Sequence, residues 1–142
     1  MADDSDRETH GSCLCGSVRY TVSGPLRSVW QCHCIRCTKI TGNFMAASGA
    51  PAANIAVDHS GTLTWFSPDD DPNVAYAFCR QCGSSLFWRT ADQDPADERW
   101  SICAGTLDDG AGLTTEAIWF SDHAAAHTHL DPQAQHFSST DL

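Results

Sequence analysis

Positive charge is scarce in this sequence, and lysine is the scarcest charged residue. The chain of 142 residues carries 8 Lys and Arg against 18 Asp and Glu, which gives a formal net charge of −10, and Lys39 is its one lysine. Nucleic acids and anionic membrane surfaces are bound chiefly by cations that neutralise their phosphates. The composition therefore argues against nucleic acid and against a membrane surface as partners.

Long apolar runs are also missing. No stretch of 18 apolar residues occurs, so the sequence predicts no membrane-spanning helix. The first ten residues, MADDSDRETH, are acidic and lack the apolar segment of a secretory signal, so we expect a cytoplasmic protein. Internal repeats and charged linkers are absent as well. We expect a disordered acidic tail at residues 1–10, a single domain at residues 11–137 and a short tail at residues 138–142.

What the chain does contain is a series of short segments rich in Val, Phe, Tyr and Trp, separated by Gly, Pro and Asp. Such segments are typical of β-strands joined by turns. One short helix is expected at Ile35–Thr41, where Gly42 can adopt the left-handed conformation that ends a helix. The prediction is a mostly β fold with one short helix and irregular loops fastened by metal. The expected strands are Ser17–Val22, Ser28–Cys34, Phe44–Ser48, Leu63–Phe66, Ala75–Cys79, Ser85–Arg89, Trp100–Ala104 and Glu116–Phe120.

Eight cysteines are many for a chain of this length. Either a disulfide framework or a set of metal sites can account for such a number. A disulfide framework is expected together with a secretory signal, and the two cysteines of a C-x-C pair are too close to bridge each other easily. The sequence has C-x-C pairs and no secretory signal, so it favours metal.

Two of the cysteine motifs together predict a closed metal site. Cys79 and Cys82 belong to a C-x-x-C-G sequence, in which Gly83 can take the positive φ of a tight turn while backbone N–H groups point at the sulfurs. Cys13 and Cys15 lie two residues apart in an extended segment and project to the same side. Zinc bound by four thiolates in a tetrahedron is a structural site. We call Cys13, Cys15, Cys79 and Cys82 the four-cysteine cluster.

The remaining motif brings three cysteines together within a short stretch. Cys32 and Cys34 share a face of an extended segment, and Cys37 follows on the first turn of the expected helix. All three can reach one metal, which would keep a fourth position for water or substrate, as in catalytic zinc sites. We call Cys32, Cys34 and Cys37 the three-cysteine cluster.

An alternative is that a further protein ligand closes this second site and makes it structural. His33 stands between two ligands in extended chain, so its side chain should point away from their metal and act as a hydrogen-bonded neighbour. Cys103 lies in an apolar strand and favours the role of a small buried hydrophobe. The group of His123, His127 and His129 has metal-like spacing, although exposure to solvent or a place in a cavity wall is favoured. The candidate fourth ligands are Cys103, His33, His127, His129 and His136.

Two other groups of residues stand out. Asp69–Asp71 lacks the downstream ligands of a Ca²⁺ or Mg²⁺ site, so it predicts a solvated loop. The tryptophans fall mostly in expected strands, which favours core packing, with one or two of them walling the open zinc. They are Trp30, Trp65, Trp88, Trp100 and Trp119.

The order of the cysteine motifs resembles a known family. Gly11–Gly16 (G-x-C-x-C-G), Cys32–Cys37 (C-H-C-x-x-C) and Cys79–Ser84 (C-x-x-C-G-S) follow one another as in the glutathione-dependent formaldehyde-activating (GFA) domain, which centromere protein V shares. The resemblance covers about residues 11–120. It implies a β-tent (Mss4-like) fold, in which folded-over antiparallel sheets are clamped by zinc. It also implies a structural zinc on the four-cysteine cluster and a catalytic zinc on the three-cysteine cluster.

The activity for which the family is named is the synthesis of S-(hydroxymethyl)glutathione, a carbon–sulfur lyase reaction in the reverse direction. The resemblance thus implies two zinc ions per chain, and it implies glutathione or another small thiol and a small aldehyde such as formaldehyde as substrates. Three thiolates weaken the Lewis acidity of zinc, so we expect thiol chemistry rather than hydrolysis.

A non-catalytic zinc module is the alternative. Such a module would capture or carry a small thiol, or present a surface to a partner protein, because the same fold can serve either role. A cytoskeletal or nucleic-acid role, as in the centromere relative, is disfavoured by the net charge of −10.

Overall fold

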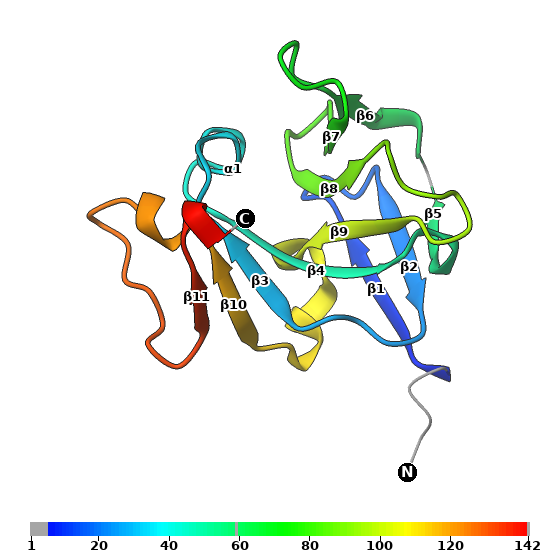
Figure 1. Ribbon diagram of the computed structural model, residues 1–142. Coiled ribbons are helices and arrows are strands. Elements are labelled where there is room, and N and C mark those ends of the chain that lie inside the picture. Colours follow the sequence, from blue (N-terminus) through cyan, green and yellow to red (C-terminus); the bar gives the residue numbers. More distant parts are fainter. Residues whose placement is uncertain (1–5, 59, 142) are drawn as a thin grey trace.

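The computed structural model describes residues 6–58 and 60–141, and this part of the chain is built mostly from β-strands with one α-helix (Figure 1). The predicted mostly β fold with a single short helix is confirmed. No helix in the described part is long and apolar enough to cross a membrane. The elements are β1 (Glu8–Ser12), β2 (Arg19–Ser23), β3 (Val29–Cys32), α1 (Ile35–Thr41), β4 (Met45–Pro51), β5 (Ile55–Asp58), β6 (Leu63–Phe66), β7 (Val74–Cys79), β8 (Ser85–Thr90), β9 (Arg99–Cys103), β10 (Thr115–Trp119) and β11 (Gln135–Phe137).

The strands form two sheets. A three-stranded antiparallel sheet has the order β1-β2-β5, and an eight-stranded sheet has the order β11-β10-β3-β4-β9-β8-β7-β6. Within the large sheet, β10 pairs in parallel with both β3 and β11, whereas the other pairs are antiparallel. Figure 1 shows the blue strands β1 and β2 beside the strands β4 and β9 of the large sheet, and residues of β2, β4 and β9 share one buried cluster.

Side-chain alternation gives the large sheet two different faces. One face packs against the small sheet, where Ile102 and Phe87 form a core with Tyr20 and Val22 of β2. The Tyr20 ring meets the Phe87 ring edge to face with centroids 5.1 Å apart. The opposite face carries a second apolar group, which includes Met45, Ala47, Val74 and Tyr76 together with Cys37 of α1. The three-cysteine cluster therefore lies on the face that the small sheet does not cover.

The helix α1 has the bounds that the sequence predicts. It runs from Ile35 to Thr41, and Gly42 follows it with φ 85° and donates its N–H to the carbonyl of Thr38 over 3.0 Å. A left-handed residue at this position is a common way to end a helix. The tight end lets the chain turn back into β4.

The expected tail at residues 1–10 is too long, because Glu8–His10 already belong to β1. This strand is mostly polar, and Gly11 in it contacts the Tyr20 ring so closely that a Cβ would collide. Its sequence therefore lacks the apolar pattern by which strands are recognised. Residues 1–5 of the expected tail lie outside the described residues.

The expected tail at residues 138–142 is hydrogen-bonded to the rest of the domain within its described part, residues 138–141. The backbone N–H and the hydroxyl of Ser139 both donate to the Asp122 carboxylate, over 2.8 and 2.6 Å. The short strand β11, which precedes this segment, is absent from the sequence prediction, since three residues carry too little pattern to be recognised.

Candidate functional site

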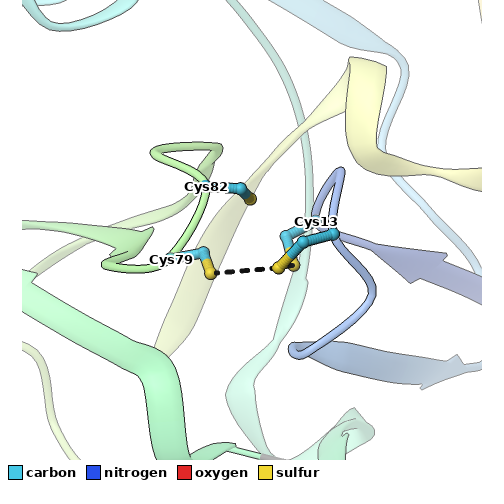
Figure 2. Close-up of side chains that lie close together, drawn as sticks. Cys13, Cys79 and Cys82 are labelled. Carbon is cyan, nitrogen blue, oxygen red and sulfur yellow. Dashed lines mark hydrogen bonds between the residues drawn. The ribbon is translucent and has the colours of Figure 1, made fainter.

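The four-cysteine cluster joins the two sheets. Cys13 and Cys15 lie in the loop between β1 and β2 of the small sheet, and Cys79 and Cys82 lie at the turn between β7 and β8 of the large sheet. All four sulfurs lie within 4.8 Å of one another, with 3.6 Å between Cys13 and Cys15 and 3.8 Å between Cys15 and Cys79. Figure 2 shows the side chains of Cys13, Cys79 and Cys82 turned toward a common point.

Backbone geometry at the β7–β8 turn aims the two cysteines there at the same point. Gly83 has φ 81°, a conformation that residues with a Cβ rarely adopt. Its N–H donates to the carbonyl of Cys79 over 2.7 Å, and the N–H of Cys79 donates to the carbonyl of Ser84 over 3.0 Å. The turn is therefore the tight knuckle that the C-x-x-C-G sequence predicts.

Hydroxyl groups surround the sulfurs of this cluster. Ser17 Oγ lies 3.3 Å from Cys79 Sγ, as does Thr62 Oγ1, and together they lower the pKa of Cys79 to about 5. Ser84 Oγ lies 3.2 Å from Cys82 Sγ and lowers the pKa of Cys82 to about 7. Donors of this kind favour thiolates, which are the form of cysteine that binds metal.

The geometry of the four-cysteine cluster fits zinc. Four sulfurs held 2.3 Å from a tetrahedral zinc lie about 3.8 Å from one another. The sulfur–sulfur distances of 3.6 and 3.8 Å given above agree with this value. Both cysteine clusters could bind a metal ion, and the sulfur-only donor set is one that zinc prefers.

The three-cysteine cluster is assembled where β3 passes into α1. Cys32 ends the strand, Cys34 caps the helix and Cys37 lies in its first turn, and the three sulfurs lie within 4.8 Å of one another. Cys34 Sγ accepts the backbone N–H of Cys37 over 3.4 Å. The neighbouring thiols of Cys32 and Cys37, together with the backbone N–H groups at the start of the helix, lower the pKa of Cys34 strongly. The helix start thus stabilises a thiolate at the centre of the cluster.

No histidine and no further cysteine of residues 6–58 and 60–141 joins the three-cysteine cluster. His33 is buried, and its Nε2 lies 3.2 Å from Gln31 Oε1 while its ring packs on Phe44. Burial lowers the pKa of His33, so that it is neutral at pH 7. It is a hydrogen-bonded neighbour, as the strand alternation predicts.

None of the other candidate ligands belongs to the three-cysteine cluster. Cys103 ends β9 and packs, half-buried, on the same apolar group as Cys37, and burial raises its pKa to about 12, which fits the expected role of a small hydrophobe. The candidate histidines of the C-terminal segment are exposed, and the imidazole Nε2 of the last one lies 2.7 Å from the carbonyl oxygen of Asp131. They are His127, His129 and His136.

A cavity of about 650 Å³ adjoins the three-cysteine cluster. It lies over the face of the large sheet that the small sheet does not cover, and all three sulfur-bearing side chains line it. Three of the five tryptophans line it as well, so this site has more tryptophan in its wall than the one or two residues expected. The aromatic lining residues are Trp30, Tyr76, Trp88, Trp119 and Phe120.

The sequence match establishes the family. Residues 8–123 match the model of the family described as glutathione-dependent formaldehyde-activating enzyme. The chain belongs to the GFA family. No curated protein matches the sequence. A crystal structure of a Rhodobacter sphaeroides protein shares the fold with a TM-score of 0.57 and 22% identity, over 75% of this chain and 97% of that one.

Sequence reasoning grouped the cysteines of this GFA protein as the structure does, and the role of each cysteine as a zinc ligand stays a prediction. It missed the contribution of β7 to the cavity, although Val74 and Tyr76, two residues apart, do show the alternation of one strand face. Asp69–Asp71 form a loop in which Asp69 and Asp70 are exposed, as predicted. The sequence did not indicate that the carboxylates of Asp70 and Asp71 pair with Arg36 at 3.3 and 3.0 Å, which attaches this loop to α1.

Proposed function

We propose that this GFA protein is a zinc-dependent carbon–sulfur lyase that forms or breaks an S-hydroxymethyl thiol at the three-cysteine cluster. One observation supports this proposal above the others. The three sulfurs lie together at the wall of a cavity of about 650 Å³, and the described residues offer no fourth protein ligand. An open coordination position beside a cavity is typical of catalytic zinc sites.

The reaction has a simple balance. The sulfur of a small thiol bonds to the carbonyl carbon of a small aldehyde such as formaldehyde, and the π electrons of the C=O bond move to the oxygen. The thiol loses one proton and the oxygen takes up one proton, so the number of protons is unchanged. The reverse path breaks the same carbon–sulfur bond, and no electron is gained or lost overall.

The residues around the cavity have separate roles in this proposal. The three-cysteine cluster would hold zinc, which lowers the pKa of an incoming thiol so that its thiolate is present at neutral pH. The apolar walls exclude water from the reacting groups, which strengthens electrostatic interactions between them.

We assign to Tyr76 the role of donating a hydrogen bond to the carbonyl oxygen of the aldehyde. Its side chain lines the cavity and packs against Cys37, and only 5% of the residue is exposed. Burial and the charge of the cysteine thiolates raise its pKa, so that the phenol keeps its proton at neutral pH. A neutral phenol can donate a hydrogen bond to the oxygen on which negative charge develops.

Turnover experiments test the proposal. Zinc-loaded protein is mixed with formaldehyde and a panel of small thiols, and the loss of free aldehyde is followed against the spontaneous reaction. We expect acceleration that disappears when a chelator removes zinc and in the Cys37→Ser variant. Thiol binding without any acceleration would instead support a module that captures or carries thiols.

A further inference from the structure

The cavity beside the three-cysteine cluster has an apolar wall. On the sheet side, the register places Tyr76 beside Trp88 and Trp88 beside Ser101, so that aromatic rings of neighbouring strands lie next to one another. Met45 of β4 and Val74 of β7 add aliphatic surface. Rings and methyl groups of this kind stabilise an apolar ligand by removing its surface from water.

The cations of this cavity are already engaged. The lining includes Arg27 and Arg36, and no other Lys or Arg of the described residues. Arg36 is paired with the carboxylates of Asp70 and Asp71, and Asp70 itself lines the cavity. Arg36 and its partners therefore contribute little net positive charge to the binding of an incoming anion.

Arg27 is held by the fold. Its guanidinium donates to the carbonyl of Ser28 over 3.3 Å and to those of Ala47 and Ser48 over 3.0 and 3.1 Å. It also lies over the Trp30 ring, 3.7 Å from the centroid. Within residues 6–58 and 60–141, only the two N–H groups of its remaining nitrogen have no such partner, so the donors that Arg27 keeps for a ligand lie on a single nitrogen.

We propose that this cavity selects a thiol with an uncharged, ring-bearing body over a peptide thiol such as glutathione, which carries two carboxylates and one ammonium group. The inference rests on the proposed function, since it assumes that a thiol enters the cavity. Size does not decide between the two ligands, because about 650 Å³ accommodates either. Charge and polarity decide, since a carboxylate buried without a partner is unfavourable and a ring buried among rings is favourable.

Calorimetric titration of the zinc-loaded protein with phenylmethanethiol and with glutathione tests the inference. We expect a dissociation constant at least tenfold lower for phenylmethanethiol. Equal or tighter binding of glutathione overturns the inference and leaves the proposed thiol chemistry standing. If neither thiol binds, both the inference and the proposed function are wrong.

Two variants, each with a matched control, examine the cause of the selectivity. Asp70→Asn removes a carboxylate from the lining, so glutathione should bind several-fold tighter while phenylmethanethiol is unchanged. Asp69→Asn changes the net charge equally, but Asp69 does not line the cavity, so it should alter neither affinity. An equal effect of both variants would mean that overall charge, and not the lining, governs binding, and would overturn the inference.

The second pair of variants tests the aromatic wall of the cavity. Trp88→Leu should weaken phenylmethanethiol at least fivefold and leave glutathione within twofold of the original protein. Phe66→Leu is the control, because Phe66 is 51% exposed and does not line this cavity. If Trp88→Leu leaves phenylmethanethiol binding unchanged, the aromatic wall does not recognise the thiol body and the inference fails.

Discussion

In the proposed function, the protonated hydroxyl of Tyr76, a residue that lines the cavity, donates a hydrogen bond to the carbonyl oxygen. Replacing Tyr76 by Phe removes this donor and keeps the ring, so we expect kcat to fall by about 100-fold, while zinc content and thermal stability stay close to those of the original protein. Steady-state turnover and elemental analysis measure the two effects.

Tyr20 supplies the matched control, because it does not line the cavity. Its hydroxyl is hydrogen-bonded to Thr106 Oγ1 at 2.7 Å in the core between the sheets. Tyr20→Phe should cost about 1 kcal/mol of stability and leave kcat unchanged. A loss of activity in Tyr20→Phe equal to that in Tyr76→Phe would contradict the role assigned to Tyr76.

Individual residues also show what the sequence can reveal. The grouping of the cysteines was predictable because C-x-C and C-x-x-C spacings fix which sulfurs face the same way within a few residues. The neighbours of Trp88 in the sheet could not be predicted, because the position of β8 between β9 and β7 depends on the strand order of the whole sheet. The ion pairs of Arg36 likewise join residues that are distant in the chain, and no local pattern marks them.

Among the elements, the β7–β8 turn depends on one backbone conformation. Gly83 has φ 81°, and a Cβ added there would meet no atom within 4 Å. Gly83→Ala should therefore destabilise the protein through its backbone alone, by about 1–2 kcal/mol, as measured by chemical denaturation. Gly105→Ala is the control, because Gly105 also has open space but no positive φ, and it should change stability little.

The two cysteine clusters belong to different kinds of element and should respond differently to mutation. The four-cysteine cluster connects the β1–β2 loop to the β7–β8 turn, so Cys79→Ser removes a link between the sheets. Binding energy of this kind is folding energy, and we expect a large fall in Tm or insoluble protein. Cys37→Ser affects a cluster built within one strand–helix junction, so the domain should stay folded with one zinc fewer.

Circular dichroism and metal analysis of the two variants measure this difference. Equal unfolding of Cys37→Ser and Cys79→Ser would contradict it and would make the three-cysteine cluster structural. The contrast was predictable from the sequence, since the first cluster is distributed over two motifs and the second is contained in one.

For the whole molecule, we expect two zinc ions per chain that leave at different pH values. Protons compete with zinc for thiolates, so a cluster whose cysteines have lowered pKa values keeps its metal to lower pH. Hydroxyl donors lower the pKa of Cys79 to about 5 and that of Cys82 to about 7. In the other cluster, hydrogen bonding among the three thiols lowers the pKa of Cys34, raises that of Cys32 to about 11 and raises that of Cys37. These opposite shifts offset one another, but this cluster offers three thiolates where the other offers four, so it should lose zinc first as the pH falls.

A zinc-sensitive dye followed from pH 8 to pH 4 should record this release in two phases. Cys37→Ser should lack the phase at higher pH. A single phase, or a preserved first phase in that variant, would contradict the assignment.

The separation of the clusters along the chain also affects how the protein is made. During translation, Cys32, Cys34 and Cys37 leave the ribosome almost together, so their cluster can take up metal while most of the large sheet has not yet been synthesised. Cys13 and Cys15 emerge earlier still but must wait for Cys79, which follows Cys15 by 64 residues, and for Cys82. During that interval the nascent chain exposes an unpaired dithiol, and a shortage of zinc or an oxidant in the cell would act on it before the two sheets can be joined.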